Sequence, residues 1–174
     1  MSKRISLIAF VAAVVFQLLI LVAVPARKVV TLSTGKTVLL KVQPVDPYNM
    51  LSGYYNTFNF DIADVNAFPN AQVFPNDSWV YAIVQRGDDG VWTPALLVPD
   101  LPTNLPENRA ALLGQIRYGR IKYGIEELYV PEAQRYTVGE DLRLNPDKAR
   151  VEVKVDKNGH VALVRLKIED RIYE

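Results

Sequence analysis

Two glutamates six positions apart, Glu126 and Glu132, are the side chains of this sequence best suited to acid-base chemistry. A buried carboxyl with a raised pKa can donate a proton, and a second carboxylate can accept one. Glutamates at this separation also occur in ordinary surface segments, where they form ion pairs or lie at a helix N-terminus. We favour this structural interpretation and keep catalysis by Glu126 or Glu132 as the alternative.

Other catalytic and metal-binding chemistry finds little support in the sequence. His160 is the only histidine and follows a turn, where we expect it to be exposed, and there are no cysteines. These counts exclude thiol catalysis and Cys-based zinc sites, and no clustered carboxylate spacing suggests another metal site. No serine outside the apolar N-terminal run lies in a recognisable nucleophile context, and no phosphate-binding glycine pattern occurs. We therefore predict no metal and no cofactor.

A second group of residues combines a turn with neighbouring aromatic rings. Asp46 and Pro47 are typical of a turn entry, and Gly53 permits a backbone conformation that is closed to other residues. Tyr54 and Tyr55 follow, and exposed aromatic rings can bind an extended peptide or a sugar. We favour a structural role for this segment. If the protein binds a ligand, the predicted binding residues are Tyr54 and Tyr55 of this segment together with Glu126 and Arg135.

The clearest secondary-structure pattern lies near the C-terminus. Val151, Val153 and Val155 alternate with charged residues, and a second alternating run covers 162–168. Asn158-Gly159 between the two runs predicts a β-hairpin with a type I′ turn. The expected register pairs Val155 with Ala162, Val153 with Val164, Val151 with Leu166, and Glu152 with Arg165.

The rest of the chain beyond the N-terminus has mainly the patterns of further strands and turns. Two more hairpins are expected, one from residues 29–32 and 37–42 and the other from residues 79–85 and 92–98. Three runs are expected to be extended, namely 57–62, 112–118 and 120–123. Residues 99–108 are expected to form a proline-rich loop, and residues 131–141 a short helix.

The strongest single signal is the apolar run from residue 5 to residue 24. It carries no charge and only two polar side chains, Ser6 and Gln17, so a helix of this length can cross a bilayer. A signal peptide is the rival interpretation, but its apolar core usually spans about 7 to 15 residues, and Pro25 lies where cleavage would occur. We therefore predict a retained transmembrane helix. Its small and polar residues Ser6, Ala9, Ala13 and Gln17 form one face that lets another helix approach, although such residues are common in any membrane helix.

The distribution of charged residues gives only weak evidence for the side of the membrane on which the domain lies. Lys3 and Arg4 precede the apolar run, whereas four basic residues follow it between positions 27 and 41, which slightly favours a cytoplasmic domain. Long domains translocate with little regard to charge, and the run begins close to the N-terminus, so we predict an extracytoplasmic domain. After Lys28, 16 Lys and Arg stand against 19 Asp and Glu, a formal charge of −3, with no clustered basic run. We therefore predict no nucleic-acid partner.

Residues 44–60 and 123–132, taken with the apolar run, resemble the GDYXXLXY family of membrane-anchored proteins, whose biochemical role is unassigned. The first segment keeps the family's Asp-Pro, leucine, Gly53 and Tyr55, but Tyr54 replaces the motif aspartate. Phe58 and Phe60 replace the family's leucine and final tyrosine. The replaced aspartate argues against a catalytic role for that position throughout the family.

The second segment matches the family's glycine at Gly124 and its isoleucine, glutamate and later Val-Pro-Glu. The resemblance implies that Asp46, Pro47, Gly53 and Gly124 are structural motif residues. Members of the family are often encoded beside multi-pass membrane proteins, so the resemblance also implies that the partner is an integral membrane protein.

The sequence thus predicts a mostly β protein: a single-pass N-terminal transmembrane helix followed by an antiparallel β domain with one minor helix. The expected division is a tail and anchor at 1–28 and a β-rich domain at 29–174. We expect a non-enzymatic structural or binding partner of another membrane protein, located in the cell membrane. The alternative is a cell-envelope hydrolase that uses Glu126 or Glu132 as acid or base.

Overall fold

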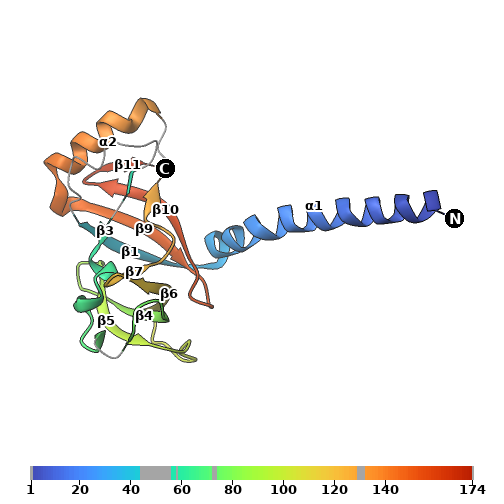
Figure 1. Ribbon diagram of the computed structural model, residues 1–174. Helices are drawn as coiled ribbons and strands as arrows, with labels where there is room; N and C mark the ends of the chain where they lie inside the picture. Colours follow the sequence, from blue (N-terminus) through green and yellow to red (C-terminus); the bar gives the residue numbers. More distant parts are fainter. Residues whose placement is uncertain (1, 44–55, 58, 72–73, 129–131, 174) are drawn as a thin grey trace.

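The computed structural model describes residues 2–43, 56–57, 59–71, 74–128 and 132–173, and it shows a long helix that projects from a β-rich domain (Figure 1). This helix, α1, spans Ser2–Thr34. Its stretch Leu7–Thr34 is long and apolar enough to cross a bilayer, and the most apolar part of it is not buried in the structure. The large apolar side chains from Leu7 to Val22 are therefore exposed and not covered by the described part of the domain.

The hairpin expected from residues 29–32 and 37–42 is wrong, because residues 29–34 continue α1. The β-branched Val29 and Val30 suggested a strand, but a helix already formed in the apolar run extends through them. The helix ends at Gly35, whose N–H donates to the Thr31 carbonyl at 2.9 Å. A Cβ on Gly35 would lie 2.4 Å from that carbonyl, so only glycine lets the chain turn here into the first strand.

The strands form one large, mostly antiparallel sheet and a separate two-stranded ribbon. Along the large sheet the order is β11-β10-β9-β1-β5-β4-β6-β7, with β3 also paired to β1. The strands are β1 Lys36–Gln43, β3 Asn59–Phe60, β4 Trp79–Arg86, β5 Trp92–Val98, β6 Arg109–Arg117, β7 Arg120–Lys122, β9 Ala149–Val155, β10 Val161–Ile168 and β11 Arg171–Tyr173. The ribbon pairs β2, Asn56–Thr57, with β8, Glu127–Leu128.

The large sheet consists of two antiparallel halves that meet at one parallel contact. Strand β1 pairs with β9 over six residue pairs, from Lys36 with Val155 to Lys41 with Arg150, but with β5 only at Leu40 and Trp92. Alternate residues of β1, including Val38 and Leu40, are fully buried in a core to which both halves contribute side chains. The prediction of a mostly β, antiparallel domain with an apolar N-terminal helix is confirmed.

The C-terminal hairpin is confirmed, whereas its predicted turn and half of its register are wrong. Glu152 pairs with Arg165 and Val151 with Leu166, as expected, but a bulge at Val164 shifts the other pairs by one residue. Val153 therefore faces Leu163, and Val155 faces Val161. Within this turn Gly159 has a positive φ, of 85°, and Asn158 does not, whereas a type I′ turn needs a positive φ at both. The Gly159 N–H donates to the Asp156 carbonyl, as in a type I turn followed by a glycine bulge.

The hairpin from residues 79–98 is confirmed as the antiparallel pair β4 and β5. Strands β6 and β7 also lie where extended runs were expected, and residues 99–108 contain no strand. The extended run at 57–62 is only partly correct, since Asp61–Ala63 forms a 3₁₀ turn, η1. A second 3₁₀ turn, η2, follows at Val65–Ala67.

One minor helix, α2, spans Glu132–Leu144 and is followed by the 3₁₀ turn η4, Pro146–Lys148. Val138 buries its side chain in the core, and Asp141 accepts hydrogen bonds from Arg171 at 2.9 Å and from the hydroxyl of Tyr173. These contacts hold α2 against β11 at the end of the sheet near the C-terminus (Figure 1).

Candidate functional site

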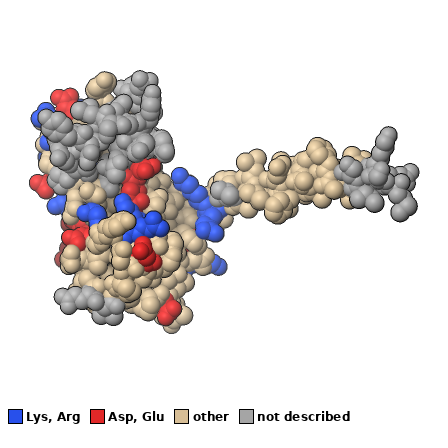
Figure 2. All heavy atoms as spheres, viewed as in Figure 1, with Lys and Arg blue, Asp and Glu red and all other residues tan. Residues whose placement is uncertain are grey.

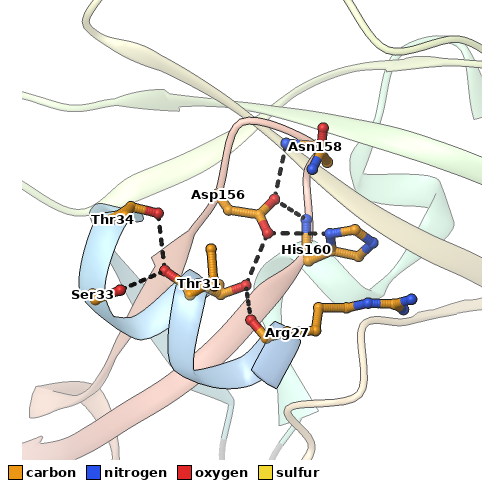
Figure 3. A network of polar contacts seen from close by, with 8 residues as sticks. Arg27, Thr31, Ser33, Thr34, Asp156, Asn158 and His160 are labelled. Atoms are coloured by element: carbon orange, nitrogen blue, oxygen red, sulfur yellow. Dashed lines mark hydrogen bonds and ion pairs between the residues drawn. The ribbon is translucent and has the colours of Figure 1, made fainter. Parts of the chain in front are cut away.

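The last turn of α1 is hydrogen-bonded to the turn of the β9–β10 hairpin (Figure 3). The Thr31 hydroxyl donates to Asp156 Oδ2 at 2.9 Å and lies 3.1 Å from the Arg27 carbonyl oxygen. Thr31 is only 1% exposed, which is unusual for a polar residue on a helix that projects from the domain. The end of α1 is therefore part of the folded domain.

Asp156 also organises the hairpin turn itself. Its Oδ1 accepts the backbone N–H groups of Asn158 at 2.9 Å and His160 at 3.0 Å, and its Oδ2 lies 3.1 Å from His160 Nδ1. Burial by itself raises the pKa of this carboxyl. The hydrogen bonds from Thr31, Asn158 and His160 stabilise the charged form and outweigh burial, so the pKa of Asp156 lies below its usual value.

The hairpin turn is packed against the other half of the sheet through Gly159. Its carbonyl accepts the backbone N–H of Leu113, on β6, at 2.8 Å. A Cβ at Gly159 would lie 2.8 Å from Cε1 of Tyr81, on β4. One turn thus joins α1 to both halves of the sheet.

Glu126, which the sequence analysis kept as an alternative catalytic candidate, stabilises a second turn. Its Oε1 accepts the N–H of Tyr123 at 2.6 Å, and its Oε2 accepts the N–H of Gly124 at 3.0 Å. Gly124 has a φ of 78°, so the predicted structural glycine occupies a backbone conformation that disfavours other residues. Both carboxylate oxygens of Glu126 are thus bonded to its own loop.

This second turn is fixed to the segment that follows the first motif. The buried Tyr123 hydroxyl donates to the Ile62 carbonyl at 2.7 Å, and burial, followed by the nearby Glu126 carboxylate, raises the pKa of Tyr123 well above its usual value. Strand β2, directly after Tyr55, pairs with β8, directly after Glu126. The structure therefore brings the two motif segments side by side, although they are about 70 residues apart.

The Asp156 turn and the Glu126 turn line one cavity of about 540 Å³ beside the end of α1. Its lining includes Thr31 and His160 from the first region, Tyr123 and Gly124 from the second, and Trp79. Its basic side chains come from α1, β6 and β7; they are Arg27, Lys28, Arg117 and Lys122. Figure 2 shows Lys and Arg side chains gathered where α1 meets the domain. Among the described residues, no group of three or more His, Cys, Asp or Glu is placed to hold a metal ion.

The family model of the GDYXXLXY protein matches residues 17–166, which is most of the chain, and therefore includes half of α1, both motif segments and the sheet as far as β10. The chain belongs to the GDYXXLXY family. No curated protein and no solved structure matches it. In this GDYXXLXY protein the matched region contains both turns that line the cavity, together with Thr31.

The remaining predicted site residues are placed only in part. Glu132 is the first residue of α2, as expected, and Arg135 follows one turn later. The other motif and binding residues, namely Asp46, Pro47, Gly53, Tyr54 and Tyr55, lie outside the described residues.

The roles of Thr31, Asp156 and the four basic residues of the cavity were not predicted from the sequence. Asp156 stands two residues before Asn158, a spacing typical of an aspartate that caps its own turn, so this local role could have been found. Nothing local indicates that Thr31 lies opposite it, because 125 positions separate the two residues. The basic residues come from three elements and form no run in the sequence.

Proposed function

We propose that this GDYXXLXY protein is a non-enzymatic, membrane-anchored partner of another integral membrane protein, with its β domain on the extracytoplasmic side. The observation that carries this proposal is that α1 leaves the domain with its apolar surface uncovered while its last turn is fixed by Thr31. A helix of this length and composition is stable in a bilayer, where its backbone groups bond internally. Because the helix end is fixed, a contact made by α1 within the bilayer also orients the domain.

The position of Glu126 favours a binding partner over a hydrolase. A general acid must reach the substrate with its carboxyl group, whereas both oxygens of this carboxylate accept backbone N–H groups of the same loop. Glu126 is also not among the residues that line the cavity, although its neighbours Ile125 and Glu127 are. A structural role explains each of these contacts without a reaction.

The helix contact can be tested with two matched double variants that keep α1 apolar. Ala9→Leu with Ala13→Leu enlarges the face of small residues, and Val11→Leu with Val15→Leu enlarges a different face by a smaller step. We expect the alanine variant to lose a co-purifying membrane protein in mild detergent and the valine variant to retain it, because small residues permit close helix approach. Equal retention by both variants, or no co-purifying protein with the unaltered chain, would contradict the proposal.

The proposed topology is tested separately. Protease added to intact spheroplasts should digest an epitope placed at the C-terminus while a cytoplasmic control protein stays intact. Protection of that epitope until lysis would place the domain inside the cell and show that the basic residues after the span had determined topology.

A further inference from the structure

The cavity beside α1 begins at the level where the headgroups of a bilayer would lie. Val24 is the last residue of the apolar run. At about 1.5 Å per helical residue, Arg27 lies about 4 to 5 Å and Thr31 about 10 Å beyond it along the helix axis. The headgroup layer on each side of a bilayer is about 5 to 8 Å thick. If α1 spans the membrane as proposed above, the residues at the start of the cavity lie within or just above the headgroups.

The charge of the cavity is opposite to that of the domain. Among the described residues, the cavity is lined by Arg27, Lys28, Arg117 and Lys122 and by one carboxylate, Glu127, whereas the chain after Lys28 has a net charge of −3. Arg117 lies 4.0 Å from Asp77, a loose contact between two exposed side chains. In the described part of the chain, Arg27, Lys28 and Lys122 have no carboxylate within ion-pair distance. Among the described residues, these three cations thus have no competing carboxylate, and we take them as the groups that pair with an external anion.

An exposed aromatic ring completes the wall. Trp79 is 61% exposed and lines the same cavity, whereas the second tryptophan, Trp92, is 4% exposed in the core. Tryptophan is favoured at the membrane–water interface, where its ring contacts the acyl boundary and its N–H stays hydrated. Arginine and lysine together suit a phosphate group, which arginine can bind through two parallel hydrogen bonds.

We propose that this cavity binds the phosphate-bearing headgroup of an anionic phospholipid. Its volume, about 540 Å³, is within the range of small-molecule sites. Such a lipid places its phosphate among the basic side chains and its acyl chains beside the apolar surface of α1. The bound lipid then fixes the height and tilt of the domain over the bilayer.

Trp79 provides a direct readout of this binding. In a Trp92→Phe background, the full chain in neutral detergent is titrated with short-chain phosphatidylglycerol, short-chain phosphatidylcholine and inorganic phosphate, and the emission of Trp79 is followed. We expect phosphatidylglycerol to bind at least about tenfold more tightly than phosphatidylcholine, because only its headgroup carries a net negative charge. Inorganic phosphate should compete only weakly, since it lacks the acyl chains.

Two variants that each remove one positive charge distinguish lipid binding in the cavity from non-specific electrostatic attraction of the anionic lipid to the protein. Lys122→Gln removes an exposed cation of the cavity, and we expect it to weaken phosphatidylglycerol binding about threefold to tenfold. Arg143→Gln removes an exposed cation from α2, outside the cavity, and should leave the affinity unchanged. Both side chains are exposed, so both variants should fold.

Three results would overturn the proposal: equal affinity for the two lipids, equal loss with both variants, or phosphate alone binding as tightly as phosphatidylglycerol. The last result would assign the cavity to a soluble phosphate compound. The assay uses purified chain and no protein partner. Its failure is therefore distinct from failure of the proposed helix contact, which the Ala9 and Ala13 variants test.

Discussion

The Asp156 turn and the Glu126 turn share the same local chemistry and differ in what else they contact. In each, a carboxylate accepts two backbone N–H groups and a nearby glycine has a positive φ, 85° at Gly159 and 78° at Gly124. Asp156 additionally accepts the Thr31 hydroxyl, and Gly159 contacts β4 and β6. A Cβ at Gly124 would have no neighbour within 4 Å. The first turn thus joins α1 to both halves of the sheet through its own carboxylate and glycine. In the second turn the carboxylate and glycine brace only their own loop, and Tyr123 makes the distant contact, with Ile62.

The largest expected effect comes from alanine at the two glycines. Gly159→Ala combines an unfavourable φ with a close contact to Tyr81, so we expect it to lower the free energy of unfolding by about 2 to 4 kcal/mol. Gly124→Ala adds only the unfavourable φ and should cost about 1 to 2 kcal/mol. Urea unfolding of the full chain in detergent measures both values. Equal losses would show that the tertiary contacts of the hairpin turn add nothing.

Gly139 in α2 supplies the control for this comparison. It is helical, has no positive φ, and an added Cβ would meet nothing within 4 Å. Gly139→Ala should therefore stabilise the chain by about 0.5 to 1 kcal/mol, because alanine favours helix. A loss of stability at this position would indicate that the detergent assay reports something other than these local changes.

The next effect is the coupling between Thr31 and Asp156. A double-mutant cycle with Thr31→Val and Asp156→Ala should give an interaction of about 1 to 2 kcal/mol, as expected for a partly buried hydrogen bond to a charged group. Thr34→Val is the matched control, since the Thr34 hydroxyl bonds to the Val30 carbonyl within α1. Coupling of the same size for Thr34 with Asp156 would refute a specific contact.

A smaller effect is expected for Glu126→Gln. The amide retains one acceptor oxygen but presents an NH₂ group where the second oxygen accepted a backbone N–H, so the loss should be about 1 kcal/mol or less. Co-purification of a membrane partner should be unchanged at matched protein abundance. Complete loss of cellular function with normal folding and partner binding would instead favour the hydrolase.

The smallest expected effect is a pH dependence assigned to Asp156. The folded pKa of Asp156 is lowered, so its contribution to stability is present above the unfolded value of about 3.9 and is lost as pH falls through the folded value. The stability difference between the unaltered chain and Asp156→Asn should therefore be constant near neutral pH and shrink below about pH 4. A difference that grows on acidification would have the wrong sign for this assignment.

The features of the fold that could be predicted from the sequence are those set by local signals. The alternating valines of β9 and the Asn-Gly pair identified the hairpin because both signals are local. The bulge at Val164 and the glycine-bulge turn were not predicted, since the alternating pattern carries no information on the contacts that Gly159 makes with Tyr81 and Leu113 in the other half of the sheet. The helical end of α1 was missed because Val29 and Val30 favour a strand. The helix of the apolar run nevertheless continues through them, and Thr31 bonds to Asp156, which is distant in the sequence.

In the candidate site, too, features set by neighbouring residues are easier to predict than features that depend on contacts between distant parts of the chain. The sequence favoured a structural role for Glu126 as an ion pair or a helix N-terminal charge, and Gly124 was named only through the family resemblance. The hydrogen bonds of Glu126 to the backbone of its own loop were not predicted. The basic cavity was not identified, because its cations come from α1, β6 and β7 and become neighbours only in the folded chain.

Hydrogen exchange at the end of α1 tests most directly whether this helix end belongs to the folded domain. The peptide that covers residues 29–35 is followed by mass spectrometry in the full chain, in detergent, beside a peptide from β9. We expect its amides to be protected to a degree similar to β9, and to lose much of that protection in Thr31→Val, because undocked helix ends fray. Rapid exchange in the unaltered chain, or protection that Thr31→Val leaves unchanged, would contradict the account.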